Sequence, residues 1–378
     1  MKKWKPVRRS FVLDKYYYKI AVTGGLGFIG LNCLRYWIDH SFAHQFIVID
    51  DFSVGNPDDV SDMLAELGKL EIQANVAMTR YVLHRHWNPD ETAPDNPRLN
   101  SSPEKVCVDV YKHDVAQREG IELSLAGATA VVHLAGQTGV VSSIAGPTRD
   151  MEANIRGSLN VLEVCRKMRI PRFIFSSSSA PLGTCAPPAC EVSVPHPLSP
   201  YGASKLAVEG YCSAYYSSFG VKTIALRFSN VYGPRSGNKG SVIAAFIKNI
   251  FAGKPLVVFG TGNQTRDFLF VEDICEAITA ALETDNLNIF GMPIHIASGV
   301  ETTVNSLIGK IENLALSSGF GPLTVIHEPA RAGEMERCFV DIAKAKQTLG
   351  YFPKWDLDRG LEKTWRWYLQ KKEQGCAY

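Results

Sequence analysis

Short apolar runs alternate with amphipathic segments along most of the chain. The runs at 18–22, 45–50, 128–136, 172–178, 222–228 and 293–298 are rich in β-branched residues and predict buried strands. Segments between them, such as 29–40, 154–168 and 201–219, repeat apolar residues at helical spacing. Because strands that alternate with helices form parallel sheets covered on both faces, we predict an α/β fold with a doubly wound parallel sheet.

Two regions break this alternation. The segment 52–112 separates the second predicted strand from the next motif, and its middle is rich in proline, asparagine and serine, so we predict a loop or a small subdomain there. Glycine, proline and short mixed elements also dominate 235–270 and 299–355. We therefore predict a main domain at 18–228, with an insertion at 52–112, and a smaller discontinuous lobe at 229–371 with a strand returning to the sheet near 293–298.

The composition narrows the class of protein. The 40 basic and 38 acidic residues give a net charge of +2, which offers no reason to expect nucleic acid as a partner. The nine cysteines are an odd number without a C-x-x-C pair, which is typical of reduced thiols in the cytoplasm. No run of 18 apolar residues occurs, and the basic segment 1–17 lacks the apolar stretch of a signal peptide. We expect a cytoplasmic protein without a membrane partner and with a solvated N-terminal arm.

A glycine-rich turn follows the first predicted strand. Gly24, Gly27 and Gly30 fit G-x-x-G-x-x-G, and Gly25 with the last two fits G-x-G-x-x-G. Between a strand and a helix, such glycines let the backbone approach a pyrophosphate at the helix N-terminus. The second strand ends at Asp50, about 20 residues further on, where a carboxylate can bind the adenosine ribose and repel a 2′-phosphate. This context favours NAD over NADP.

A second candidate site combines a tyrosine, a lysine and serines. Tyr201 and Lys205 lie four residues apart at the start of a predicted helix, so both project from one face. We expect the ammonium to lower the phenol pKa from about 10, as a general base requires. Upstream, the strand 172–175 runs into the serines 176–179 at the edge where such sheets bind ligands. These groups fit hydride removal from a carbinol beside a nicotinamide.

Taken together, the chain resembles an extended short-chain dehydrogenase/reductase of the nucleotide-sugar epimerase and dehydratase kind. The resemblance runs from about residue 19 to residue 371. It rests on ordered motifs: TGGLGFIG, VIDDFS, KHDV, HLAG, NIRGSLNVLE, FSSSS, YGASK, LRFSNVYGPR, GTGNQTRDFLFVEDI and RAGEMERCFVDIAKAKQTLGYFPKW. It implies a Rossmann-type fold, a bound NAD and a nucleoside-diphosphate sugar as substrate, with a UDP-sugar favoured. It also implies a homodimer formed through helices that include 151–168 and 205–219.

The resemblance also implies roles position by position. Ser178, Tyr201 and Lys205 would be catalytic, with Tyr201 as the base and Lys205 holding the nicotinamide ribose. The implied cofactor residues are Gly24, Gly27, Phe28, Ile29, Gly30, Asp50, Asp51, Ser53, Asp114, Val115, Leu134, Ala135, Gly136, Asn154, Tyr201, Lys205 and Phe228. The implied substrate residues are Thr138, Ser178, Ser179, Asn230, Val257, Phe259, Arg266, Arg331 and Glu334. We expect no metal, because the histidine pairs 40/44 and 84/86 lack a convincing third ligand.

The residues after Ser178 bear on the reaction. Relatives that eliminate water carry an Asp-Glu pair where this chain has Ser179 and Ala180, and decarboxylating relatives carry a glutamate at the second position. Without these acids, the chemistry that remains is oxidation at C4, rotation of the 4-keto sugar and return of hydride to its other face. This chemistry favours a 4-epimerase. Two alternatives stay open: a dehydratase with an acid from elsewhere, such as Glu191 or the insertion, and a non-catalytic NAD-binding protein. Pro181 and Leu182 replace the usual Val-Tyr of the motif, so the sugar pocket can differ.

Overall fold

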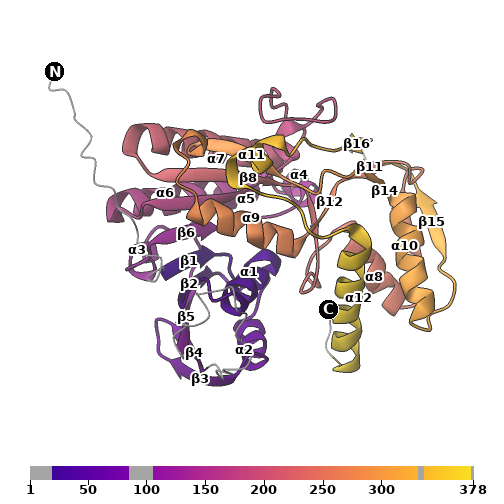
Figure 1. Cartoon of the computed structure of the whole chain (residues 1–378), viewed down its shortest axis with the longest axis horizontal. Coiled ribbons are helices and arrows are strands. Elements are labelled where there is room, and N and C mark those ends of the chain that lie inside the picture. The colour runs from indigo at the N-terminus through magenta and orange to yellow at the C-terminus, as the bar shows by residue number, and fades with distance from the viewer. Residues whose placement is uncertain (1–18, 85–104, 331–335, 376–378) are drawn as a thin grey trace.

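A mostly parallel sheet forms the centre of the molecule. The computed structural model describes residues 19–84, 105–330 and 336–375. Within these ranges the main sheet has the order β13-β8-β7-β6-β1-β2-β5-β4-β3. The strands from β13 to β5 are parallel, whereas β4 and β3 continue the sheet as an antiparallel pair. The predicted doubly wound α/β fold is confirmed, and Figure 1 shows the smaller lobe beside it.

The first part of the chain supplies most of this sheet. Its elements are β1 (Lys19–Thr23), α1 (Phe28–Asp39), β2 (Gln45–Asp50), α2 (Pro57–Ala65), β3 (Lys69–Ala74), β4 (Thr79–His84), β5 (Lys105–Lys112), α3 (Ile121–Ser124), β6 (Ala130–His133), α4 (Val140–Ala145), α5 (Pro147–Met151), a π-helical turn (Glu152–Arg156), α6 (Gly157–Met168), β7 (Arg172–Ser178), a 3₁₀ turn (Ala180–Leu182), α7 (Pro200–Phe219) and β8 (Lys222–Phe228). The predicted strands at 45–50, 172–178 and 222–228 have these bounds in the structure.

The second part builds the lobe and returns one strand, β13, to the main sheet. Its elements are β9 (Asn230–Tyr232), α8 (Val242–Phe251), β10 (Leu256–Phe259), β11 (Thr265–Arg266), β12 (Phe268–Phe270), α9 (Val271–Glu283), a 3₁₀ turn (Leu287–Ile289), β13 (Met292–Ile296), β14 (Thr302–Thr303), α10 (Val304–Ser317), β15 (Val325–Glu328), β16 (Arg337–Cys338), α11 (Ala343–Leu349) and α12 (Leu357–Glu373). None of the helices in the described ranges has the length and apolar character needed to span a bilayer.

The expectation of a loop or small subdomain at 52–112 is wrong in its described parts. The segment holds α2 and the strands β3, β4 and β5, and β5 pairs directly with β2 in the parallel part of the sheet. The reason is the polar Asp109 in the middle of β5, which interrupts the apolar pattern. Arg80 of β4 donates to both carboxylate oxygens of Asp109, at 2.6 and 2.8 Å, so the strand buries this acid as an ion pair. Residues 85–104 lie outside the described ranges.

Two apolar layers cover the faces of the sheet. One contains α1, α2 and α9, with Trp37, Leu34 and Ile278 fully buried against the strands. The other contains α3, α6 and α7, with Leu162 and Val208 buried. A third core belongs to the lobe, where α8, α10 and α12 pack around aromatic side chains. Burial of apolar area in each layer stabilises the fold by roughly 25 cal/mol per Å². The two layers therefore hold the sheet from both faces.

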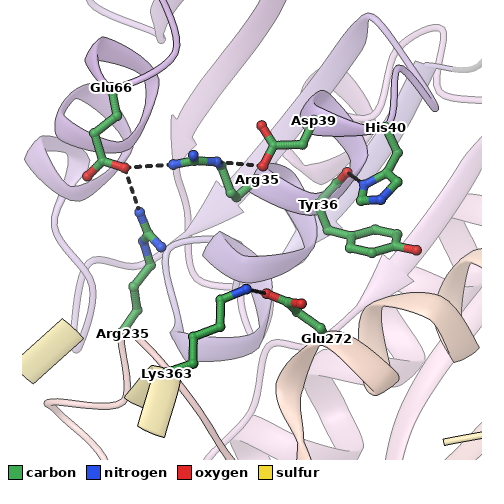
Figure 2. A network of polar contacts seen from close by, with 8 residues as sticks. All are labelled: Arg35, Tyr36, Asp39, His40, Glu66, Arg235, Glu272 and Lys363. Atoms are coloured by element: carbon green, nitrogen blue, oxygen red, sulfur yellow. Dashed lines mark hydrogen bonds and ion pairs between the residues drawn. The ribbon is translucent and has the colours of Figure 1, made fainter. Parts of the chain in front are cut away.

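Charged side chains join the main domain to the lobe. Figure 2 shows Arg35 of α1 between Asp39, at 2.7 Å, and Glu66 at the end of α2, at 2.6 Å. Arg235, in the segment after β9, reaches the same Glu66 at 3.5 Å. Lys363 of α12 pairs with Glu272 of α9. These contacts fix the segment after β9 against the two helices that follow the first strands.

A buried ion pair holds α7 to the end of the sheet. Glu209 of α7 accepts hydrogen bonds from Nε and Nη2 of Arg227 at 2.8 and 2.7 Å and from Ser177 Oγ at 2.6 Å. Both charged side chains are almost completely buried. Because water cannot replace the lost partner, removal of one charge leaves the other unsatisfied.

We predict that Glu209→Ala lowers the free energy of unfolding by about 3 kcal/mol or more, since Arg227 would keep an uncompensated buried charge. Urea denaturation at neutral pH measures the change. Glu362→Ala is the matched control, because it removes an exposed pair with Arg366 and should cost less than about 1 kcal/mol. Equal losses in the two variants would contradict this account of the α7 contact.

Candidate functional site

A cleft of about 1540 Å³ lies along the carboxyl ends of the parallel strands and extends to the lobe. It collects most of the residues singled out from the sequence. Those that line it are Gly24, Gly27, Phe28, Ile29, Gly30, Asp50, Asp51, Ser53, Asp114, Val115, Leu134, Ala135, Gly136, Thr138, Ser178, Tyr201, Lys205, Phe228, Asn230, Val257, Phe259 and Arg266. Parallel strands bring their carboxyl ends to one edge of the sheet, so residues distant in sequence meet there.

The glycine turn makes one end of the cleft. Gly24 has φ +66°, and a Cβ on it would lie 2.7 Å from the backbone nitrogen of Ala135 after β6. A Cβ on Gly30 would lie 2.5 Å from Cα of Gly25. The turn therefore packs backbone against backbone. Helix α1 begins at Phe28 without a side-chain cap and without an acid in its first turn, so its N–H groups are suited to a diphosphate.

Asp50 is held at the end of β2 beside this turn. Its Oδ2 accepts from the N–H of Leu26 at 3.0 Å, and its Oδ1 accepts from the N–H of Phe52 at 3.0 Å. Burial raises the Asp50 pKa, while these two hydrogen bonds lower it. Asp51 accepts from the N–H and hydroxyl of Ser53. The uncapped helix and the fixed carboxylate fit a dinucleotide whose ribose reaches Asp50.

Gly136 and Asn154 form the wall behind the middle of the cleft. Gly136 has φ +154°, and a Cβ on it would lie 2.3 Å from Asn154 Oδ1. Asn154 Nδ2 donates to Gln137 O and to Asp150 Oδ2, at 3.1 and 2.9 Å, whereas the buried Oδ1 has no hydrogen-bond partner among the described residues. Asn154 is buried and does not itself line the cleft. It packs directly behind Gly136, which does line the cleft.

Ser178, Tyr201 and Lys205 come together where β7 meets α7. Ser178 is the last residue of β7, and Tyr201 and Lys205 lie in the first turns of α7, which Ser199 caps by accepting from Gly202 N. Lys205 Nζ donates to Ser176 O at 2.8 Å and lies 5.8 Å from the centre of the Tyr201 ring. The hydroxyls and the ammonium thus share one end of the cleft with Phe228 and Asn230.

The expected lowering of the Tyr201 pKa is not found. Burial raises the pKa of Tyr201 to about 12, and the side-chain hydrogen bond with Ser178 only partly opposes this. The reason is the direction of Lys205: its ammonium donates to the Ser176 carbonyl instead of the phenol oxygen. Burial lowers the pKa of Lys205 to about 8, against the nearby charges of Asp150 and Glu209. The phenol is therefore protonated at neutral pH.

The sequence did not single out Asp150, which supports the catalytic end from behind. This fully buried acid accepts from the Ser204 hydroxyl on α7 and from the Asn154 amide. Its position four residues before Asn154 places both on one helical face, and this spacing was the available signal. The role of His133, a buried residue of β6 that joins β1 to α6, was also missed from the sequence. Its Nδ1 contacts Thr23 Oγ1 at 2.6 Å, and its Nε2 contacts Ser158 Oγ at 2.8 Å.

Three of the substrate candidates are not in the cleft wall that the structure describes. Ser179 is buried beneath the cleft, and its N–H donates to Phe228 O. Arg331 and Glu334 lie outside the described residues. Arg266 does line the cleft, and its Nη1 donates to Thr265 O at 2.7 Å within β11.

We predict that Gly30→Ala lowers the melting temperature and the amount of NAD retained on purification, because its Cβ would meet the Gly25 backbone, which cannot move aside cheaply. Gly210→Ala in α7 is the control: its Cβ would meet nothing within 4 Å, and alanine improves helix propensity by up to about 1 kcal/mol. Thermal melts and absorbance of the released cofactor give both quantities. Wild-type values for Gly30→Ala would show that the close approach is unimportant.

Comparisons with known proteins agree with this geometry. Residues 20–291 match the NAD dependent epimerase/dehydratase family. The chain is 31% identical to a putative UDP-glucose 4-epimerase of Methanocaldococcus jannaschii, over 92% of this chain and 97% of that protein. It is 30% identical to a dTDP-glucose 4,6-dehydratase of Neisseria meningitidis, over 94% of each chain.

Solved structures show the same relationship. UDP-glucuronic acid 4-epimerase from Bacillus cereus, in complex with UDP-glucuronic acid and NAD, superposes with a TM-score of 0.75 at 28% identity. The superposition covers 93% of this chain and 99% of that one. The resemblance and the predicted NAD are thereby confirmed. The site geometry supports the same assignment, because the glycine turn and Asp50 lie together at the edge of the parallel strands. From this geometry and the length of the match, we conclude that this chain belongs to the NAD dependent epimerase/dehydratase family.

Proposed function

We propose that the protein inverts C4 of a nucleoside-diphosphate sugar, with a UDP-sugar as the favoured substrate. The observation that carries the proposal is the composition of the catalytic end of the cleft. It holds Ser178, Tyr201 and Lys205 beside the cofactor turn, with Ser179 and Ala180 where dehydrating relatives carry an acid pair. A site with Tyr201 as the proton-transferring side chain and without acids at positions 179 and 180 suits oxidation and reduction at a single carbon.

In this mechanism Tyr201 exchanges the proton of the sugar 4-hydroxyl. The glycine turn and Asp50 would hold NAD, which would supply the hydride acceptor and donor that inversion at C4 requires. Ser178 hydrogen-bonds the same sugar oxygen and the Tyr201 phenol. Lys205, held by Ser176 O and close to Asp150 and Glu209, keeps a positive charge beside the phenol. Because burial favours the neutral phenol, the base form depends on these two neighbours.

The pyrophosphate of the substrate is expected to bind at the lobe side of the cleft. Asn230 opens β9 and Arg266 belongs to β11, so both enter the cleft from strands of the lobe. Arginine suits a diphosphate because its planar fork binds two oxygens at once. Rotation of the 4-keto sugar then takes place while the diphosphate stays anchored.

A dehydratase remains the second candidate, because dTDP-glucose 4,6-dehydratases match the chain over nearly the same length as epimerases do. Elimination of water needs an additional acid and base. Glu191, one source considered for them, accepts a hydrogen bond from His295 N at 2.9 Å and is not among the residues that line the cleft. Its position favours epimerisation.

The direct test is to incubate the protein with UDP-, GDP- and dTDP-sugars and to follow the products by NMR and mass spectrometry. An epimerase gives a product of unchanged mass with an inverted C4. A product lighter by one water would identify a dehydratase instead, and no change in any sugar under conditions where NAD is bound would support a non-catalytic protein.

We predict that Tyr201→Phe lowers turnover at least about a hundredfold and leaves NAD retention unchanged, since only the exchangeable proton is lost. Tyr211→Phe is the matched control on the same helix: Tyr211 is exposed and outside the cleft, so its loss should leave turnover within about twofold. Steady-state assays with the active sugar measure both. Near-normal turnover of Tyr201→Phe would exclude the proposed base.

We also propose that two copies associate through the surface of α6 and α7. Apolar side chains at this surface are exposed, among them Met168 and Phe219. Exposed apolar side chains on the neighbouring helices α6 and α7 are what an interface would cover. Light scattering coupled to gel filtration should give twice the chain mass, whereas a monomer at micromolar concentration would contradict the proposal.

A further inference from the structure

The segment between β9 and α8 brings two cations to the cleft. Arg235 and Lys239 both line it. The partner of Arg235 is Glu66, and Figure 2 shows this pair as part of the network on α1 and α2. Lys239 lies four residues further on and makes no ion pair with any described residue. The two neighbouring cations therefore differ in how their charge is balanced.

Protein groups surround the ammonium of Lys239. Its Nζ donates to Val231 O at 2.6 Å and lies 5.2 Å from the centre of the Phe28 ring. A carbonyl and an aromatic face stabilise a cation without neutralising it. Burial lowers the pKa of Lys239 to about 8, and no acidic side chain in the described ranges acts against this effect. The ammonium retains two N–H donors beyond the one that Val231 accepts.

A part-buried ammonium without an acidic partner costs free energy unless an anion accompanies it. The positions of its two contacts indicate where such an anion would lie. Phe28 begins α1, whose uncapped N–H groups suit a diphosphate, and Val231 follows Asn230, which is expected to approach the substrate diphosphate. Lys239 thus lies between the two places where nucleotides present their phosphates.

We propose that Lys239 is the counter-charge for a nucleotide diphosphate bound in the cleft. The ligand is either the diphosphate of NAD or that of the sugar nucleotide; for the latter, the inference rests on the proposed function. The shared chemistry is a dianionic diphosphate whose oxygens accept from Nζ.

The experiment compares nucleoside diphosphates with the nucleosides that lack the charge. Isothermal titration calorimetry on the full chain measures ADP against adenosine for the cofactor position, with protein freed of nucleotide, and UDP against uridine for the substrate position, with NAD-loaded protein. The variants are Lys239→Met and Lys239→Gln. Lys254→Met is the control for loss of a charge, since Lys254 is exposed and outside the cleft.

Removal of the Lys239 charge should reduce the preference for diphosphate over nucleoside at least about tenfold in one pair of ligands, as expected for a charge-assisted hydrogen bond. The pair that responds identifies the diphosphate, and Lys254→Met should change neither. Preferences within about twofold of wild type in both pairs would overturn the proposal, as would equal losses for nucleoside and diphosphate, which indicate a deformed cleft. If wild-type protein binds ADP but not UDP, the proposed substrate fails while the ADP pair still tests Lys239.

Discussion

The close packing of backbone at the β1–α1 turn is the constraint on which the site depends. Gly24 approaches the end of β6, and Gly30 approaches Gly25, at distances where no side chain fits. This approach starts α1 at the edge of the sheet, and the N–H of Leu26 in the same turn donates to Asp50. Everything that a dinucleotide needs at one end of the cleft follows from this turn, because the parallel strands fix the other walls relative to it.

The opposite end of the cleft depends on buried charges. Glu209 neutralises Arg227 under the end of β7, and Asp150 links α5 to Ser204 of α7. Both contacts orient the helix that carries Tyr201 and Lys205. They are costly to bury and are paired within the protein, so they hold the helix in one position. Lys239 differs because it contacts a carbonyl and an aromatic ring and forms no ion pair within the part of the chain that the structure describes.

Much of this arrangement could be predicted from the sequence. The strands with uninterrupted apolar runs, the glycine turn and the Tyr201–Lys205 spacing all depend on local patterns, and the fold and cofactor that they predict are confirmed. Strand β5 was missed because Asp109 needs Arg80 from another strand before it can be buried. The Tyr201 pKa was misjudged for a similar reason: spacing places Lys205 on the right face but does not reveal that Ser176 O takes its hydrogen bond. Contacts between distant segments decide such points, and the pattern along the chain does not contain them.

The central claim is that hydride leaves and returns to the same carbon. The most direct measurement uses the sugar nucleotide that the protein accepts, carrying deuterium at C4, and locates the label in the product by NMR. The account predicts that the deuterium remains at C4 of the inverted sugar, with the mass of the molecule unchanged. Deuterium found at C6 of a product that has lost water would contradict it and would assign the site to dehydration.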